Sequence, residues 1–221
     1  MQIKGQGAIV TGASRGLGRA LAEQLAEAGA RVVLVAREAG PLDDVVATLR
    51  GRGFEAHAIA ADIADKQASH RIAGHAQGLV GDIALAIHNA STLGPVPLRL
   101  LLDTTCEDLA AVLETNLVGP FRLTKILAGA MALRGSGTIL HISSDAAVSA
   151  YPRWGAYGIS KAAQDHLARI LAAELDGTGV RILSIDPGEM DTAMHAAAMP
   201  EADRATLQRP ADAARRIMES L

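Results

Sequence analysis

Residues 8–18 read Ala-Ile-Val-Thr-Gly-Ala-Ser-Arg-Gly-Leu-Gly. The first three residues are apolar and predict a buried strand. From Leu17 to Ala28, small and apolar side chains recur at helical spacing, and Gly29 is placed to end that helix as its C-cap. A strand that passes through a glycine-rich turn directly into a helix is typical of the first unit of an α/β fold.

Five further apolar runs, separated by stretches with helical spacing, predict the remaining strands at residues 32–35, 56–60, 83–88, 138–142 and 180–185. Because right-handed crossovers place helices on the faces of a parallel sheet, this alternation predicts a doubly wound, Rossmann-type α/β fold with helices on both faces. We expect six strands in the order 3-2-1-4-5-6. No linker or change of composition divides the chain, so residues 1–221 are expected to form one domain.

Composition narrows the classes of partner. The 221 residues are 49% apolar and 20% charged, and their net charge is −3, which argues against a nucleic-acid or membrane-surface partner and favours a small molecule. No apolar run approaches the roughly 20 residues that cross a bilayer, and the first five residues lack a signal-peptide pattern. Since Cys106 is the only cysteine, no internal disulfide is possible, and a reducing cytoplasm is the expected location.

The glycine turn predicts a dinucleotide site. Glycine lets the backbone approach a ligand closely, and the helix that follows offers free N–H groups and its positive dipole end to a pyrophosphate. A glycine-rich turn can also be simple punctuation, but its position between strand and helix favours nucleotide binding. The expected contacts are Gly12, Ser14, Arg15, Gly16, Leu17 and Gly18.

The end of the second predicted strand favours NADP(H) over NAD(H). An acidic residue there would suit a free ribose 2′-hydroxyl, but this chain has Arg37, and Arg15 lies in the glycine turn. Two guanidinium groups can flank a 2′-phosphate, each contact contributing about tenfold in affinity. Two solvated surface arginines are the alternative. Asp62 and Ile63, after the third strand, are placed to meet the adenine, although Asp62 also fits an ordinary loop acid.

Tyr157 and Lys161 predict the catalytic group. They are four residues apart in a stretch of helical spacing and therefore share one helix face. A neighbouring ammonium favours the phenolate and lowers the pKa of a tyrosine, although such a pair alone also occurs as surface decoration. Ser144 ends the fifth predicted strand, at the sheet edge where open α/β sheets bind ligands.

The sequence resembles the classical short-chain dehydrogenases/reductases over nearly its whole length. The resemblance rests on Thr11–Gly18, on Tyr157 with Lys161, and on Asn89-Ala90, Asn116, Ser144 and Pro187-Gly188 with Thr192. It implies that Tyr157 exchanges a proton with the substrate, Ser144 binds the substrate oxygen, Lys161 binds the nicotinamide ribose and lowers the tyrosine pKa, and Asn116 completes a proton relay. The cofactor contacts that it implies on the nicotinamide side are Asn89, Ala90, Tyr157, Lys161, Pro187, Gly188 and Thr192.

Pro120 gives Asn116 a separate physical interest. Proline has no N–H, so the Asn116 carbonyl, four residues earlier, loses its helical hydrogen-bond partner. We expect a water at that carbonyl, bridging to Lys161, and a kink in the helix. A proline that only bends a long helix around the core is the alternative.

Two departures from the family pattern bear on assembly and on the site. The residues after the fourth predicted strand read His88-Asn89-Ala90-Ser91, where the family has glycine at the last position, so the nicotinamide side is expected to be remodelled. No seventh strand is evident, and residues 210–221 predict one closing amphipathic helix. We therefore expect a homodimer, formed by the helices around Asn116 and Tyr157, rather than a tetramer.

The sequence thus predicts an NADP(H)-dependent oxidoreductase that transfers hydride between the nicotinamide and a small carbonyl compound or secondary alcohol. The seven histidines form no HxH or HExxH pattern, so no metal site is expected. An NADP(H)-binding sensor or regulatory protein without turnover is the alternative from another class. A sugar-nucleotide epimerase or dehydratase would normally need a longer substrate region than this chain provides.

Overall fold

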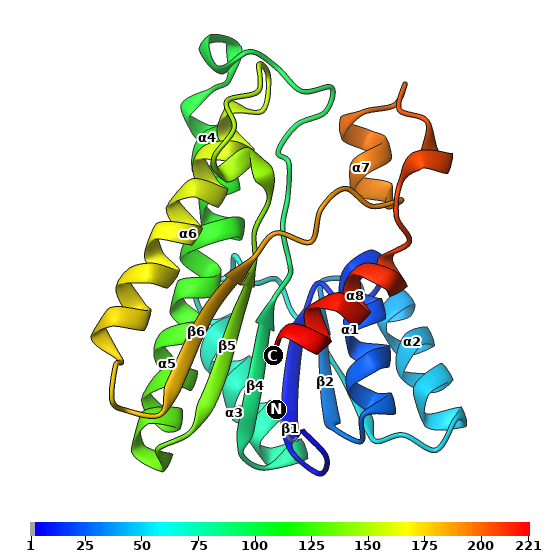
Figure 1. Ribbon diagram of the computed structural model, residues 1–221, viewed down its shortest axis with the longest axis vertical. Coiled ribbons are helices and arrows are strands. Elements are labelled where there is room, and N and C mark those ends of the chain that lie inside the picture. The colour runs from blue at the N-terminus through cyan, green and yellow to red at the C-terminus, as the bar shows by residue number, and fades with distance from the viewer. Residues whose placement is uncertain (1–2) are drawn as a thin grey trace.

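The computed structural model describes residues 3–221; Met1 and Gln2, which begin the segment inspected for a signal peptide, lie outside it. Six parallel strands form one sheet in the order β3-β2-β1-β4-β5-β6, as predicted (Figure 1). Their bounds are β1 Gly7–Thr11, β2 Arg31–Ala36, β3 Ala56–Ala60, β4 Ile83–His88, β5 Gly137–Ile142 and β6 Val180–Ile185. Three of the strands extend one residue or so beyond the predicted runs.

Helices cover both faces of the sheet (Figure 1). The helices are α1 Gly16–Glu27, α2 Ala39–Gly51, α3 Ala68–Val80, α4 Cys106–Leu113, α5 Gly119–Arg134, α6 Gly155–Glu174, α7 Ala193–Ala198 and α8 Pro210–Ser220. One apolar core lies between the sheet and α1, α2 and α8, and a second lies between the sheet and α3, α5 and α6. The central strands are therefore buried on both sides, which explains why their sequences are continuously apolar.

The chain between α4 and α5 is irregular at the position expected from Pro120. Residues Glu114–Val118 form a π-helical stretch that contains the buried Asn116, and Pro120 lies in the first turn of α5. A π-helical stretch is a local change in the hydrogen-bonding pattern of a helix, and it lies here where Pro120 removes an N–H donor. The predicted irregularity is therefore present, in this form.

The closing amphipathic helix is also present. Helix α8 packs against α1 and buries Ala213, Ala214 and Ile217. The sheet that residues 3–221 form ends at β6. Within the same residues, no helix combines the length and the apolar character that crossing a membrane requires.

The sheet order places a ligand site. From β1 the chain places β2 and then β3 on one side of β1, and it then returns to place β4 on the other side. The direction in which strands are added to the sheet therefore reverses between β1 and β4. A crevice at the carboxyl ends of strands flanking such a reversal is where open α/β sheets bind ligands. The glycine turn follows β1 and Asn89 follows β4, and α7 lies beyond this same edge (Figure 1).

Candidate active site

The glycine turn is shaped by close backbone contacts. Gly12 has φ +67°, and a Cβ added there would lie 2.8 Å from the Cα of Ala90. A Cβ added at Gly18 would clash with the Gly12 carbonyl oxygen and with the Asn89 side chain. The Asn89 amide donates hydrogen bonds to the carbonyls of Thr11 (3.0 Å) and Gly12 (3.2 Å). Asn89 therefore braces the turn from β4, and glycine is required at both positions.

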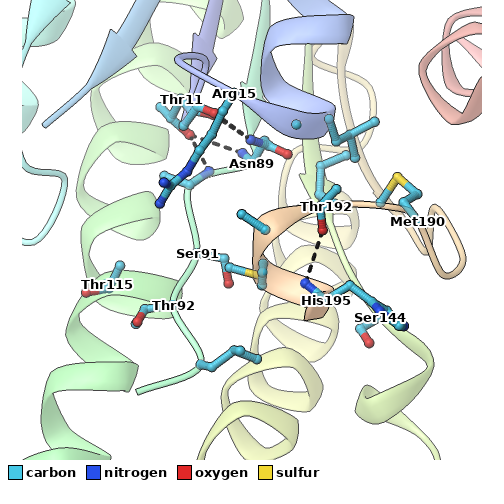
Figure 2. A pocket seen from close by; sticks show the side chains of 18 of the residues that line it. Thr11, Arg15, Asn89, Ser91, Thr92, Thr115, Ser144, Met190, Thr192 and His195 are labelled. Atoms are coloured by element: carbon cyan, nitrogen blue, oxygen red, sulfur yellow. Dashed lines mark hydrogen bonds between the residues drawn. The ribbon is translucent and has the colours of Figure 1, made fainter. Parts of the chain in front are cut away.

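An open cleft of about 850 Å³ runs along the carboxyl ends of the strands. Of the residues predicted from sequence, it is lined by Gly12, Ser14, Arg15, Gly16, Leu17, Arg37, Asp62, Ile63, Asn89, Ala90, Ser144, Tyr157, Lys161, Pro187, Gly188 and Thr192. In Figure 2, Arg15 and Asn89 lie near the glycine turn and Ser144 lies toward the other end of the view. Gly18 and Asn116 do not line the cleft; they pack behind the residues that do.

The end of the cleft near β2 carries two exposed cations. Arg15 immediately precedes α1, and Arg37 follows β2. Within residues 3–221, neither guanidinium forms a salt bridge, so both remain available to an anionic ligand. Asp62 lies at the same end, where its carboxylate already accepts a hydrogen bond from the Ala64 N–H (2.9 Å). This contact is what an ordinary acidic residue in a loop makes, and it leaves the second carboxylate oxygen of Asp62 for a ligand.

The opposite end holds the three predicted catalytic side chains. Lys161 is fully buried on α6, and its Nζ lies 5.7 Å from the centre of the Tyr157 ring. Ser144, at the end of β5, donates a hydrogen bond to the Asp145 carboxylate (3.0 Å) and accepts one from the Ala146 N–H (3.2 Å). Tyr157, Lys161 and Ser144 thus meet at one end of the cleft, as the sequence predicts.

The expectation of a lowered tyrosine pKa is wrong for this structure. Burial raises the pKa of Tyr157 to about 12, the Ser144 hydroxyl opposes this shift, and the carboxylates of Asp186 and Asp145 add to it. The Lys161 ammonium donates to the Ile142 carbonyl (2.6 Å) rather than to the phenol, so burial sets the direction of the shift in the tyrosine pKa. Tyr157 is therefore a neutral phenol at pH 7, the form that donates a proton.

Burial also shifts the pKa of the neighbouring Lys161. The pKa of Lys161 is lowered to about 8 by burial, against the attraction of Asp165. At pH 7 this lysine is consequently still an ammonium, but only about one pH unit from losing its charge.

Asn116 lies behind the site. Its side-chain amide donates to the Thr92 carbonyl (2.9 Å) and to Ser160 Oγ (2.9 Å), and its oxygen accepts from the Thr92 N–H (2.8 Å). Its backbone carbonyl, where we expected a water, accepts from Gln164 Nε2 (3.1 Å). Sequence reasoning missed Gln164; the available signal was a polar side chain three residues after Lys161, on the helix face that meets the core.

A buried pair of histidines lies on the adjacent strands β4 and β5. His88 and His141 are register partners on β4 and β5, with ring centres 4.7 Å apart. His88 Nε2 is 2.8 Å from Thr124 Oγ1, which matches the expected core role. Burial lowers both pKa values, that of His141 to about 3, so both rings are neutral at pH 7.

The segment after β6 lines one side of the cleft. Thr192 Oγ1 accepts from the His195 N–H (3.1 Å) and begins α7, as Figure 2 shows. A bridge between Met190 and Gln208 ties the two ends of this segment together. The cleft itself remains open to solvent.

Comparisons with known proteins agree with this geometry. The family profile described as short chain dehydrogenase matches residues 6–203. A short chain dehydrogenase of Pseudocercospora fijiensis is 36% identical over 200 residues, which are 88% of this chain and 63% of that protein, so the chain spans less than two thirds of that relative.

Solved structures share the fold. A 7α-hydroxysteroid dehydrogenase complexed with NADH and 7-oxo glycochenodeoxycholic acid is 30% identical and superimposes with a TM-score of 0.91, covering 98% of this chain and 87% of that one. A short chain dehydrogenase of Shigella flexneri complexed with NADP is 28% identical, with a TM-score of 0.88, and the match covers 96% of this chain and 88% of that one.

Proposed function

The chain belongs to the short-chain dehydrogenase family, and we propose that it is an NADP(H)-dependent oxidoreductase that reduces a small carbonyl compound to a secondary alcohol, with Tyr157 as the proton donor. The observation that carries this proposal is the buried, neutral Tyr157 beside Ser144 and the Lys161 ammonium, at the end of a cleft that begins at a glycine turn. These groups supply a proton and a hydrogen bond at one carbonyl oxygen.

The residues of the cleft fit a dinucleotide. The backbone at Gly12 has no room for a side chain, and Gly16, with φ +55°, begins α1, whose free N–H groups suit a pyrophosphate. We assign Arg15 and Arg37 to the 2′-phosphate, Asp62 and Ile63 to the adenine, and Lys161 to the nicotinamide ribose. When bound, the cofactor supplies the hydride from its nicotinamide C4.

The protein's own residues then act on the substrate oxygen. Tyr157 donates its phenolic proton as negative charge develops on that oxygen. Ser144 turns its O–H from Asp145 to the same oxygen and stabilises the charge. Lys161, charged at pH 7, offsets the cost of the phenolate that Tyr157 leaves behind. Because Tyr157 is a neutral phenol at pH 7, it begins the reaction in the protonation state that reduction requires.

The NADP(H) preference rests on the two unpaired arginines. Solved relatives bind NADP in one case and NADH in another, so family membership leaves the choice open. Two exposed guanidinium groups, at the end of β2 and in the glycine turn, have no acid partner among residues 3–221, and they support NADP(H) for this chain.

We also propose a homodimer, formed by the outer face of α6 and the neighbouring α4. Ile159 and Ile170 on α6 are each more than 40% exposed, as large apolar side chains on a dimer face would be in one isolated subunit. Light scattering of the purified protein measures the mass directly, and a monomer or a tetramer would contradict this assignment.

The function is tested by following NADPH absorbance with a panel of ketones, aldehydes, quinones and keto-sugars. Oxidation of NADPH that depends on one of these compounds supports the proposal. A protein that binds NADPH, seen by fluorescence, yet oxidises it with none of them would be a sensor, the alternative function.

A further inference from the structure

We propose that Gln164 is a positioning residue of the reaction, whose side-chain amide ties the Lys161 ammonium directly to the Asn116 carbonyl and takes the place of a relay water. The proposal rests on the proposed function, because Lys161 acts there on the cofactor ribose and on Tyr157. The experiments below separate the two.

The contacts define a single bridge. Gln164 lies on α6 and is almost fully buried. Its Oε1 accepts from Lys161 Nζ at 3.1 Å, and its Nε2 donates to the Asn116 carbonyl at 3.1 Å. A lysine ammonium only donates and a carbonyl only accepts, so one orientation of the amide satisfies both partners.

The backbone explains why the carbonyl of Asn116 is available. Pro120 has no N–H to donate four residues later, and the stretch around Asn116 is π-helical. A buried carbonyl without a partner would cost free energy, and Gln164 satisfies it from the neighbouring helix. Glutamine supplies both a donor and an acceptor here, which neither a glutamate nor an aliphatic side chain of similar size can do.

The bridge fixes the direction of Lys161. Its ammonium has three donors; one is used by the Ile142 carbonyl and one by Gln164. The third remains for the cleft, which Lys161 lines. Lys161 is thereby held in one geometry before any cofactor arrives.

The bridge also closes one route for protons. A water passes a proton between its partners, whereas a neutral amide donates and accepts without ionising. Gln164 therefore blocks the expected route from Lys161 through the Asn116 carbonyl.

Few titratable groups lie around Lys161 and Gln164. On α6 these are Tyr157 and Asp165; from β5 comes His141, with His88 of β4 beyond it; and after β5 and β6 come Asp145 and Asp186. Helix α5 and the π-helical stretch contribute the neutral Thr124 and Asn116. Because both histidines are neutral at pH 7, a change at Gln164 acts on Lys161 without a second titration in the same pH range.

The test is the titration of Lys161 in the cofactor-free protein, followed by NMR of ¹³C-labelled lysine. The other lysines, Lys4, Lys66 and Lys125, provide reference signals. The variants are Gln164→Glu and Gln164→Met, which keep the length of the side chain. Thr124→Val is the matched control, because it removes one buried hydrogen bond of the same layer, to His88, without touching Lys161.

We expect opposite shifts from the two variants. A carboxylate beside the ammonium raises the pKa of Lys161 by about one unit, whereas a thioether removes an acceptor and lowers it by about half a unit or more. Thr124→Val leaves it unchanged. Equal pKa values in all variants, or shifts in one direction only, would overturn the proposal. If Gln164→Met fails to fold, the rise expected for Gln164→Glu alone decides.

Kinetics give the second readout. The pH at which kcat/KM falls on the alkaline side moves up in Gln164→Glu and down in Gln164→Met, together with the NMR pKa. A merely structural role would lower the rate equally at every pH. If the wild-type protein turned over no substrate, the proposed function would fail while the lysine titration would still decide the role of Gln164.

Discussion

The two ends of the cleft are built by different means. Near the glycine turn the chain presents backbone, with Gly12 and Gly18 packed too closely for a side chain and with exposed arginines around them. At the other end it presents buried side chains, Tyr157, Lys161 and Gln164, held by one another and by backbone carbonyls. The first end depends on local conformation and the second on burial, so substitutions at the second should have the larger effects on the reaction.

The largest effect is expected at Tyr157. Tyr157→Phe removes the proton donor and should lower kcat by about a thousandfold while NADPH still binds, because the hydroxyl is used only in the chemical step. The measurement is the NADPH-oxidation rate beside fluorescence-detected NADPH affinity. Tyr151→Phe is the control, since the other tyrosine is half exposed and lies outside the cleft. A rate near that of wild type would remove Tyr157 from the mechanism.

The contrast between the ends also marks what sequence could predict. The strands, their order and the glycine turn follow from patterns a few residues long, and they are confirmed. Gln164 was missed because its bridge joins α6 to a carbonyl 48 residues away. The direction of the Tyr157 pKa was missed because a four-residue spacing places Lys161 on the same face but does not say that its ammonium points to the Ile142 carbonyl.

The second largest effect is expected at the glycine turn, where packing leaves no room for a side chain. Gly18→Ala places a methyl group against the Gly12 carbonyl and the Asn89 amide, so the turn must shift. We expect a loss of about 2 kcal/mol in the free energy of unfolding, together with weaker NADPH binding. Gly74→Ala, in an open position of α3, is the matched control and should be neutral or stabilising by about 0.5 kcal/mol. Urea denaturation measures both, and equal stabilities would show that the turn yields easily.

The third prediction concerns the two buried histidines, His88 and His141, on the strands next to the catalytic end of the cleft. His141 has a pKa of about 3 in the folded protein and about 6.5 when unfolded, so below pH 6.5 the unfolded chain binds the extra proton and stability falls. His88 acts in the same direction. Between pH 6 and pH 5 we expect His141 to remove about 1 kcal/mol from the free energy of unfolding, and His88 to add to this loss.

Substitution tests this assignment. His141→Phe keeps a ring beside His88 and should remove the contribution of His141, about 1 kcal/mol between pH 6 and pH 5, from the pH dependence. The exposed His75→Gln should leave the pH dependence unchanged. Urea denaturation at several pH values between 5 and 7 provides the slope. A slope unaffected by His141→Phe would mean that this ring is not buried in the neutral form.

The smallest effects are expected at the exposed arginines, where solvent screens each charge. Arg15→Ala and Arg37→Ala should each weaken NADPH binding by about tenfold and leave NADH binding unchanged, because only NADPH carries the 2′-phosphate. Fluorescence titration with both cofactors gives the ratio, and Arg71→Ala, on the outer side of α3, is the control. Added salt should reduce the difference between wild type and variant. Equal losses for both cofactors would instead assign the arginines to the shared pyrophosphate, and the chain would then have no electrostatic basis for preferring NADP(H).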